Sequence, residues 1–576
     1  MPAEAASMVA EEATLERLRA LQDRHWPVGV ARAPHYQYGE IPLSDYLRRH
    51  AADRPASTAL VFYGAEWSYE ELDRQSDRFA SLLLARGVRA GDRVAVLLPN
   101  CPQFAIAFYG ILKAGCVHVP VNPLFKEFEL AYELEDSGAE TIVALDTLMP
   151  LVRAVRAQTR VRHVFVTSFA EVLPQRPTIP VPDSIAAPRV VCLDAEDLLP
   201  ALAAQPDAAS LPSPDLDAPA ALNYTGGTTG MPKGCVHTQR HMLYTAATTC
   251  TVATPLGPGD VALNFYPIFW IAGEDMGLVF PIFSGATLVL LARWDPVAFA
   301  AAVERHRVTV AALLVDNAVE MLDHPATAAY DLRSLQRVRV SSFVKKLNAV
   351  YRERWRERTG TTLIEAAWGM TETHTCDTFV NGLQENDMDV ESRPIFVGLP
   401  VPGTDFLIRD FETRELVPFE TEGEIWVRTP SLMTAYWKRP EETAAAVEDG
   451  WFATGDIGLH DERGFLHFLG RRKEMLKYRG MSVFPAEIEA FLGRHPGVAG
   501  SGVIGRPDER YGEVPVAFVV VAEEARESLT AEALEAWCRE RLATFKVPEI
   551  RIADSLPMTA TGKVKKDELA RRLLEK

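Results

Sequence analysis

The sequence has 576 residues, which is too long for one hydrophobic core and predicts two to four folding units. Apolar residues make up 48% of the chain and charged residues 24%, as in an ordinary globular protein. Because 78 acidic residues outnumber 60 basic ones and leave a net charge of −18, we expect neither nucleic acid nor an anionic membrane surface as a non-specific partner.

The N-terminal residues lack the basic-then-apolar pattern of a signal peptide, and no apolar run approaches the ~20 residues that span a bilayer. Leu15, Leu18 and Leu21 have helical spacing, which predicts a short helix packed on the body. Seven cysteines are scattered without CxxC pairs, so we expect neither a disulfide framework nor a zinc ribbon. The cytoplasm is therefore the expected compartment.

The first two hundred residues alternate between helical and strand patterns. Residues 72–87 have helical periodicity, residues 92–99 form a buried-strand run, and residues 105–115 are helical again. This alternation predicts an α/β fold of layered subdomains with largely parallel strands. A shift to Ala, Pro, Asp and Ser over residues 200–219 predicts a surface connection.

After about residue 400 the pattern changes to short strands, with candidates at residues 423–430 and 464–470. The last hundred residues combine strands, a helix and a basic tail, which is typical of a small α+β unit. The charged run GRRKE at residues 470–474 predicts the boundary. The sequence therefore predicts a large N-terminal domain over residues 1–470 and a small C-terminal domain over residues 471–576.

The run YTGGTTGMPKG at residues 224–234 cannot form a core strand or helix, because glycines weaken both and hydroxyls compete for backbone hydrogen bonds. Backbone N–H groups, hydroxyl donors and one lysine make an anion-binding nest suited to nucleotide phosphates. The spacing differs from the Walker A pattern, and a Gly/Thr-rich surface turn is the alternative for this run alone. The candidate phosphate-binding residues are Thr225, Gly226, Gly227, Thr228, Thr229, Gly230 and Lys233.

Later segments supply other groups that a nucleotide needs. The run AAWGMTET at residues 366–373 offers a flat ring for a base, a hydroxyl for a phosphate oxygen and a carboxylate for Mg²⁺. The run WFATGDIG at residues 451–458 presents a carboxylate after a glycine, which would let it accept both hydroxyls of a ribose. The candidate residues in these segments and further on are Trp368, Thr371, Glu372, Asp456, Arg471 and Lys563.

In this order the motifs resemble those of the acyl-adenylate-forming superfamily, which includes acyl-CoA synthetases, adenylation domains of peptide synthetases and luciferases. The resemblance runs from residue 67 to residue 570 and rests on five separate motifs. It implies a large N-terminal domain of stacked α/β layers and a small mobile α+β C-terminal domain that swings about a hinge at Lys473. It also implies two half-reactions, in which a carboxylate and Mg·ATP give acyl-AMP and pyrophosphate, and a thiol then displaces AMP.

The resemblance also implies a role for each motif. The loop at residues 225–234 would hold the β- and γ-phosphates, and Thr225 and Glu372 would hold Mg²⁺. Lys563 would contact the carboxylate and the α-phosphate as charge develops. The other implied contacts are Trp368 with adenine, Thr371 with the α-phosphate, Asp456 and Arg471 with the ribose, and Lys477 and Gly480 with the channel for the pantetheine arm of coenzyme A. Taken singly, each residue has a structural alternative, such as a turn, a core position or a solvated surface.

Two segments depart from the family pattern. Where the family usually has P-x-F-H-x-x-G at the acyl pocket, this chain has PIFWIAG, with Trp270 in place of the histidine. Where the family usually has a small-residue SGGAPL turn, residues 341–346 read SSFVKK and place Phe343 and Val344 at positions of Gly and Ala. If Trp270 and Phe343 line the pocket, a compact acid of medium length, or a cyclic or aromatic one, should fit best. The alternative is that both rings turn into the core.

We therefore expect an acyl-CoA synthetase that uses ATP, Mg²⁺ and coenzyme A to activate a mainly apolar monocarboxylic acid. A stand-alone enzyme that loads a carrier protein is the nearest alternative, a luciferase-like oxygenase is more distant, and the SSFVKK departure motivates a catalytically silent nucleotide-binding protein. The expected partners are small molecules, a homodimer is left open, and no zinc site is expected at His237 and His241. The acidic run at residues 385–391 predicts a solvated loop.

Overall fold

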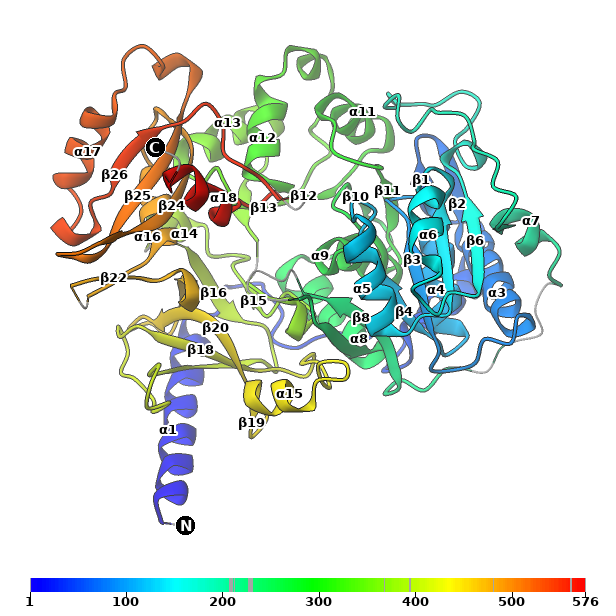
Figure 1. The fold of residues 1–576 in the computed structure, drawn as a ribbon, viewed down its shortest axis with the longest axis horizontal. Coiled ribbons are helices and arrows are strands. Elements are labelled where there is room, and N and C mark those ends of the chain that lie inside the picture. The colour runs from blue at the N-terminus through cyan, green and yellow to red at the C-terminus, as the bar shows by residue number, and fades with distance from the viewer. Residues whose placement is uncertain are drawn as a thin grey trace.

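The computed structural model of the protein describes residues 2–206, 211, 213–225, 231–366, 368–392, 395–479, 481–559 and 562–574. Within these residues the strands form four sheets. Figure 1 shows the N-terminal layers, in blue to green, on the right and the C-terminal sheet, in orange, on the left. No helix among the described residues is both long and apolar enough to cross a membrane.

The first sheet contains the buried-strand run predicted at residues 92–99. Its pairs are parallel except the last, β8 with β9. Strands such as β5 are buried along their whole length, as expected when both faces of a parallel sheet are covered. In spatial order the strands are β7 (Glu196–Asp197), β6 (His163–Thr167), β5 (Thr141–Leu145), β3 (Arg93–Leu97), β4 (Val117–Pro120), β8 (Pro219–Tyr224) and β9 (Gly234–Thr238).

The second sheet is also parallel, apart from the antiparallel pair β1 and β2 at one edge. These two sheets confirm the predicted α/β layering. In spatial order the strands are β14 (Leu363–Glu365), β13 (Arg337–Ser341), β12 (Val310–Leu314), β10 (Val261–Asn264), β11 (Thr287–Leu290), β1 (Thr58–Phe62) and β2 (Ala65–Ser68).

The third sheet is antiparallel and contains the strands predicted at residues 423–430 and 464–470. In spatial order its strands are β15 (Thr378–Phe379), β16 (Phe396–Pro400), β21 (Leu466–Arg471), β20 (Trp451–His460), β18 (Gly423–Arg428) and β17 (Asp405–Arg409), and β19 (Val447–Glu448) pairs with β20.

The fourth sheet belongs to the C-terminal part of the chain. The short 3₁₀ helix η8 (Arg472–Glu474) connects the last strand of the third sheet to the first strand of this one. In spatial order the strands are β23 (Met481–Val483), β22 (Leu476–Tyr478), β25 (Gly512–Val521) and β24 (Val498–Asp508), and β26 (Glu549–Ile552) lies parallel beside β25.

The helices pack between and around these sheets, and the predicted helices at residues 72–87 and 105–115 are confirmed as α3 and α4. The α-helices assigned in the described residues are α1 (Pro2–His25), α2 (Leu43–Asp53), α3 (Tyr69–Ala85), α4 (Pro102–Lys113), α5 (Glu127–Ser137), α6 (Met149–Arg156), α7 (Leu198–Ala203), α8 (Gln239–Thr248), α9 (Ile271–Glu274), α10 (Phe280–Ser284), α11 (Pro296–His306), α12 (Val315–Asp323), α13 (Ala349–Thr359), α14 (Met388–Glu391), α15 (Pro440–Ala446), α16 (Pro485–Leu492), α17 (Ala531–Arg539) and α18 (Lys566–Leu574).

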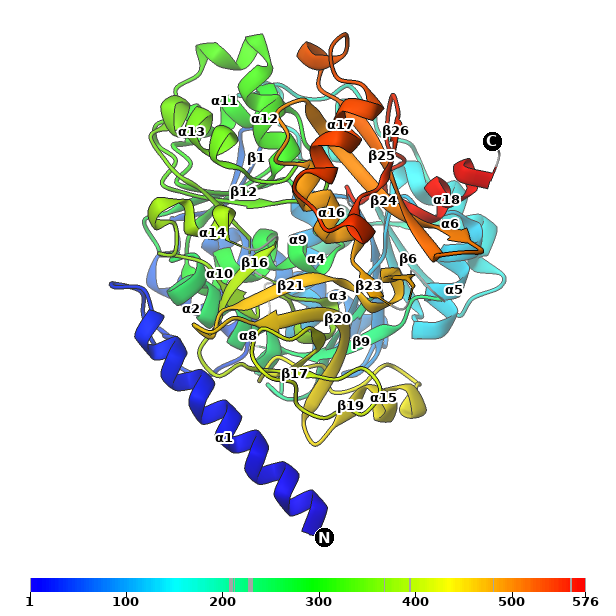
Figure 2. The same ribbon diagram turned by 90° about the vertical axis from the view of Figure 1, so that its left-hand side faces the viewer.

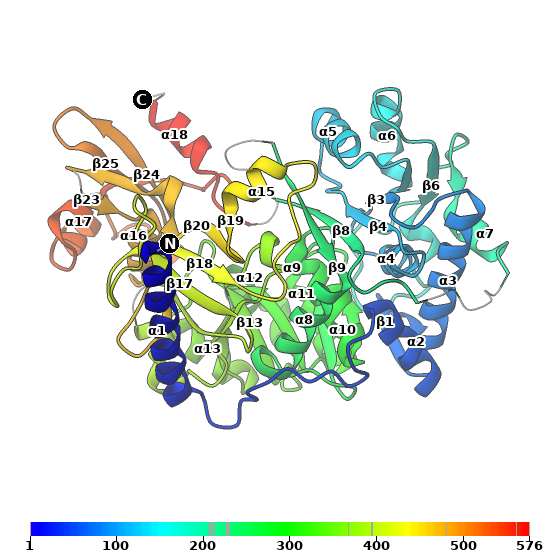
Figure 3. The ribbon, with the colours of Figure 1, turned by 90° about the horizontal axis from the view of Figure 1, so that it is seen from below.

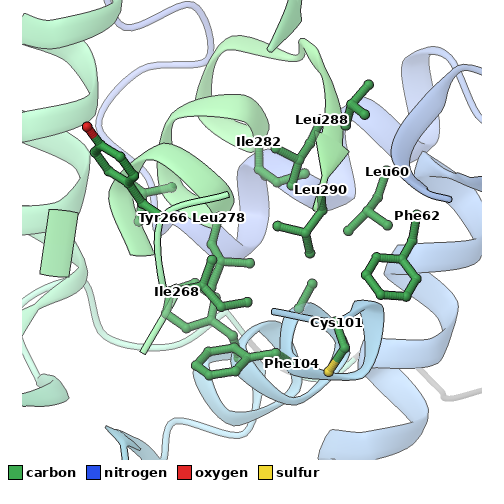
Figure 4. Close-up of a cluster of buried hydrophobic side chains, with 14 of the residues drawn as sticks. Leu60, Phe62, Cys101, Phe104, Tyr266, Ile268, Leu278, Ile282, Leu288 and Leu290 are labelled. Carbon is green, nitrogen blue, oxygen red and sulfur yellow. The ribbon is translucent and has the colours of Figure 1, made fainter. Parts of the chain in front are cut away.

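One continuous apolar core joins the two parallel sheets. Leu60 and Leu290 from adjacent strands point toward Phe104 at the start of α4, as Figure 4 shows. All three side chains are at most 2% exposed. The two parallel sheets therefore share one buried apolar core.

Helix α1 lies beside β17 and β18 of the third sheet (Figure 3), and its N-terminal end projects from the body (Figures 1 and 2). Leu15 and Leu18 are buried against Leu407, Trp426 and Trp451, which confirms the predicted packing of the N-terminal helix. The prediction that this helix is short is wrong, since α1 spans 24 residues. Leu21 is half-buried.

The prediction of a solvated loop at residues 385–391 is wrong. The segment forms a 3₁₀ turn followed by α14, and Asp389 is 6% exposed. Its carboxylate pairs with the buried guanidinium of Arg352 at 2.7 Å, and Asp387 contacts the same group at 2.7 Å. A buried arginine therefore organises this acidic run, which its local charge pattern does not reveal.

Candidate active site

A cavity of about 1660 Å³ lies between the N-terminal layers, the third sheet and the C-terminal part. Ligand pockets usually occupy ~300–1,000 Å³, so this one has room for a nucleotide and a second molecule. The predicted site residues that line it are Thr225, Trp270, Phe343, Trp368, Thr371, Glu372, Asp456, Arg471 and Lys563. Residues distant in the sequence therefore meet at one surface.

Asp456 is a buried carboxylate at the cavity wall, 2% exposed. It lies on β20 opposite Arg471 on β21, and the Arg471 Nε lies 3.1 Å from the Asp456 Oδ1. The Trp368 Nε1 donates to the Asp456 Oδ2 at 3.1 Å. Burial raises the pKa of Asp456 above its usual range, while the Arg471 charge acts to lower it. These contacts fix the orientation of the carboxylate.

Trp368 combines a core position with a place at the cavity wall. It is 8% exposed and packs edge-on against Phe406 in the core of the third sheet. Its indole N–H nevertheless reaches Asp456, and the residue lines the cavity. Trp368 thus packs in the core and also lines the cavity.

Thr371 and Glu372 lie on the 3₁₀ turn η6 (Thr371–Thr373). The Tyr436 hydroxyl donates to the Glu372 Oε1 at 2.8 Å, and the buried His237 Nε2 donates to the Thr371 carbonyl at 2.7 Å. Desolvation holds the pKa of His237 well below its usual range, and the neighbouring His374 lowers it further. Neutral His237 therefore acts as a support behind the turn.

Thr225 and Lys233 close the predicted phosphate loop at its two ends. The Thr225 N–H donates to the Lys233 carbonyl at 2.9 Å, and the Lys233 N–H donates to the Thr225 hydroxyl at 3.2 Å. The Lys233 ammonium lies 3.2 Å from the Glu442 Oε2 and 4.1 Å from the Tyr436 ring centroid, and it is not among the cavity-lining residues. Gly226, Gly227, Thr228, Thr229 and Gly230 lie outside the described residues.

The donor set fits Mg²⁺. The Glu372 carboxylate and the Thr225 hydroxyl both line the cavity, and Mg²⁺ is usually bound through one or two carboxylates together with substrate phosphates. Among the described residues, no group of three or more His, Cys, Asp or Glu side chains could hold a metal ion. A Mg²⁺ ion held here would therefore share the phosphate oxygens of the nucleotide.

Lys563 is exposed, and it lines the cavity from the C-terminal side. Desolvation by the surrounding walls lowers its pKa, the positive charge of Arg471 lowers it further, and Asp456 acts in the opposite direction. Its ammonium lies 5.3 Å from the Phe343 ring centroid and 6.0 Å from that of Trp270.

The remaining predicted residues lie elsewhere. Val344 packs against the apolar cluster of the C-terminal sheet that includes Ile504, away from the cavity-lining set. Lys473 is an exposed residue of η8. The Lys477 Nζ donates to the Ser482 hydroxyl at 3.2 Å on the exposed hairpin of β22 and β23. Gly480 lies outside the described residues.

The sequence did not reveal the residues that hold Glu372 and Ser342 in place by hydrogen bonds. Tyr436 is 64 residues from Glu372 in the chain, and Glu365 accepts hydrogen bonds from the Ser342 N–H at 2.9 Å and the Ser342 hydroxyl at 2.5 Å. Tyrosine and glutamate carry no local motif at these positions. Only the three-dimensional pairing identifies them.

Comparison with known proteins agrees with this geometry. The family described as AMP-binding enzyme matches residues 47–437, and its C-terminal domain matches residues 487–563. A long-chain-fatty-acid–CoA ligase of Bacillus subtilis (strain 168) is 33% identical over 561 residues, 95% of this chain and 97% of its own. A feruloyl-CoA synthase of Amycolatopsis sp is 34% identical and covers 92% of this chain and 99% of its own.

Solved structures extend the similarity to the fold. The anthranilate CoA ligase AuaEII in complex with anthranoyl-AMP superposes with a TM-score of 0.80 at 26% identity, over 93% of this chain and 98% of its own. ATP-bound MatB from Rhodopseudomonas palustris gives 0.78 at 27% identity, over 92% and 98%. The chain belongs to the AMP-binding enzyme family, within the acyl-adenylate-forming superfamily.

Proposed function

We propose that the protein is an AMP-forming acid–thiol ligase, which activates a mainly apolar monocarboxylic acid with ATP and transfers the acyl group to coenzyme A. The observation that carries this proposal is the meeting of Asp456, Glu372 and Lys563 at one cavity. The similar proteins support it, since they include CoA ligases for long-chain fatty, ferulic and anthranilic acids.

Asp456 would bind the ribose of ATP. Trp368 and Arg471 hold its carboxylate at the cavity wall, and a charged acceptor strengthens hydrogen bonds from ribose hydroxyls. Trp368 would present its ring toward the base, and Thr371 would bind the α-phosphate from the turn that His237 supports. Residues in and beside the third sheet would thus hold the nucleotide.

In the first step, an oxygen of the substrate carboxylate attacks the α-phosphorus of ATP. The bond from this phosphorus to the bridging oxygen breaks, and pyrophosphate leaves. Two like unit charges 4 Å apart repel by ~1 kcal/mol in water and ~4 kcal/mol at an effective dielectric of 20, so positive charge must converge on this point. Lys563 would supply it from one side of the cavity, and Mg²⁺ held by Glu372 and Thr225 would neutralise phosphate charge.

In the second step, the thiol of coenzyme A attacks the acyl carbonyl and AMP leaves. We propose that the domain over residues 471–576 turns about Lys473 between the steps, relative to the domain over residues 1–470. Strand β21 ends at Arg471 and β22 begins at Leu476, which supports this division. Lys477 lies outside the cavity lining in the present arrangement, as expected if it serves only the second step.

Trp270 and Phe343 line the cavity, which supports the proposal of a compact acid of medium length, or a cyclic or aromatic one.

The cysteines are free thiols, which supports a cytoplasmic location.

Pyrophosphate release over a panel of carboxylic acids tests the function. Straight-chain acids of increasing length, benzoate and cyclohexanecarboxylate should be supplied with and without coenzyme A. We expect acid-dependent release of pyrophosphate, and formation of AMP and thioester when the thiol is present. Release that is independent of every acid would contradict the proposal. Transfer to a holo-carrier protein in preference to coenzyme A would favour the carrier-loading alternative.

A further inference from the structure

The ammonium of Lys563 lies near two aromatic rings that come from different parts of the N-terminal layers. Trp270 precedes α9, and Phe343 follows β13. The Lys563 Nζ lies 6.0 Å from the first ring centroid and 5.3 Å from the second, within the range at which a cation is attracted by a ring face. Both rings are half-buried and line the cavity beside Lys563.

The loop that carries Lys563 is folded against one of these rings. The Thr559 N–H donates to the Lys563 carbonyl at 2.7 Å, and the Lys563 N–H donates to the Thr559 hydroxyl at 3.0 Å. Gly562 has a φ of +79°, and a Cβ atom there would lie 2.9 Å from the Leu314 Cδ1 and 3.9 Å from the Phe343 Cδ2. Glycine permits this close approach, which directs the lysine toward the rings.

Residues next to Phe343 make a second contact with the C-terminal part. The Lys345 Nζ donates to the Ala499 carbonyl at 3.1 Å. Val344 meets Gly500 so closely that a Cβ atom at position 500 would lie 2.5 Å from the Val344 Cγ1. We call residues 342–346 the docking segment. Its start is fixed by the hydrogen bonds from Ser342 to Glu365.

We propose that Trp270 and Phe343 are positioning residues that hold the Lys563 ammonium for the adenylation step, and that the docking segment is the surface on which the C-terminal part closes for this step. The inference rests on the proposed function and deepens it. A ring attracts an ammonium without neutralising it, whereas a carboxylate partner would oppose its action on an anionic substrate. Trp270 and Phe343 thus position the Lys563 ammonium without cancelling its charge.

If the rings attract the ammonium, the rate of acyl-AMP formation should depend on the presence of an aromatic ring at each position. Replacing Phe343 by Leu or Trp270 by Leu keeps an apolar side chain and removes the π-face. We expect each variant to lower the rate of acyl-AMP formation about 3–10-fold with the acids that the wild type prefers, as the loss of one cation–π contact implies. Phe343→Tyr and Trp270→Phe, which keep a ring, should restore most of the rate.

The experiment measures pyrophosphate release and, separately, thioester formation from supplied acyl-AMP. Pyrophosphate release should fall more than thioester formation does in Phe343→Leu, since the contact with Lys563 belongs to the first step. In a Lys563→Ala background, Phe343→Leu should cause no further loss. A further loss of the same size, or a changed preference among acids without a general loss of rate, would overturn the proposal and favour a wall of the acyl pocket.

A second measurement is independent of turnover. Acetic anhydride labels amines, and mass spectrometry reports the labelling of Lys563 relative to Lys126, an exposed lysine that is not among the cavity-lining residues. We expect Phe343→Leu and Trp270→Leu to raise the labelling of Lys563 several-fold, with no change in Phe343→Tyr or at Lys126. Equal labelling in all variants would overturn the proposal. A wild type that releases no pyrophosphate with any acid would contradict the proposed function, and labelling would still decide this inference.

Discussion

At the scale of the single residue, Asp456 carries the nucleotide-binding part of the account. Asn has nearly the same shape and lacks the charge, so we expect Asp456→Asn to raise the Kd for ATP by one to two decades. Hydrogen bonds to a charged acceptor are worth ~1.5–3 kcal/mol, which corresponds to this range. Isothermal titration calorimetry measures the change. The exposed Asp554 provides a matched control, and an unaltered affinity in Asp456→Asn would refute the assignment.

Glu372 is the residue on which the metal assignment depends. Glu372→Gln keeps an acceptor for the Tyr436 hydroxyl but removes the negative charge. If Mg²⁺ supplies several kcal/mol of charge stabilisation, adenylation should slow by several orders of magnitude. The concentration of Mg²⁺ needed for half-maximal pyrophosphate release should also rise. Normal turnover and normal Mg²⁺ dependence would rule out this role.

At the scale of the element, the hydrophobic pattern of a segment predicts its secondary structure where neighbouring residues in the chain determine its packing. The run at residues 92–99 contains β3, and the run at residues 72–87 overlaps α3. Both predictions succeed because the burial pattern of each run is set by the layer in which it lies. The prediction of a solvated loop at residues 385–391 failed because the partner of these acidic residues, Arg352, comes from α13. The sequence identified Trp270, Phe343 and Lys563 but not the contact between them, since no local motif records a contact made by separate parts of the chain.

Glu365 holds the docking segment, and its pKa predicts a pH dependence of stability. Burial raises the pKa of Glu365 to about 7 from a usual value near 4.5. The folded state therefore binds more protons than the unfolded state between these values, so the free energy of unfolding falls as pH rises through this window. We expect Glu365→Gln, which mimics the protonated form, to gain roughly 1–3 kcal/mol over the wild type at pH 8 and little at pH 4.5.

Denaturant unfolding of both proteins at pH 4.5, 6 and 8 measures this difference. Glu412→Gln, at an exposed position, is the control. A difference between Glu365→Gln and wild type that is the same at all three pH values would show that the carboxyl is not titrating in this window.

At the scale of the whole molecule, the two proposed half-reactions require two arrangements of the C-terminal part. Proline fixes φ, so Lys473→Pro should permit acyl-AMP formation yet block thioester formation, because the proposed pivot can no longer turn. Lys473→Ala removes only the exposed side chain and should permit both steps. Rapid-quench measurement of each half-reaction separates these results. Survival of both steps in Lys473→Pro would place the pivot elsewhere.

The most direct test of the central claim is Lys563→Ala assayed in the two half-reactions. We expect acyl-AMP formation to be nearly abolished, because the ammonium is needed where the carboxylate meets the α-phosphate. Thioester formation from supplied acyl-AMP should be retained, and both steps should survive in the exposed neighbour variant Lys565→Ala. Equal loss of both half-reactions in Lys563→Ala, or full retention of adenylation, would contradict the account.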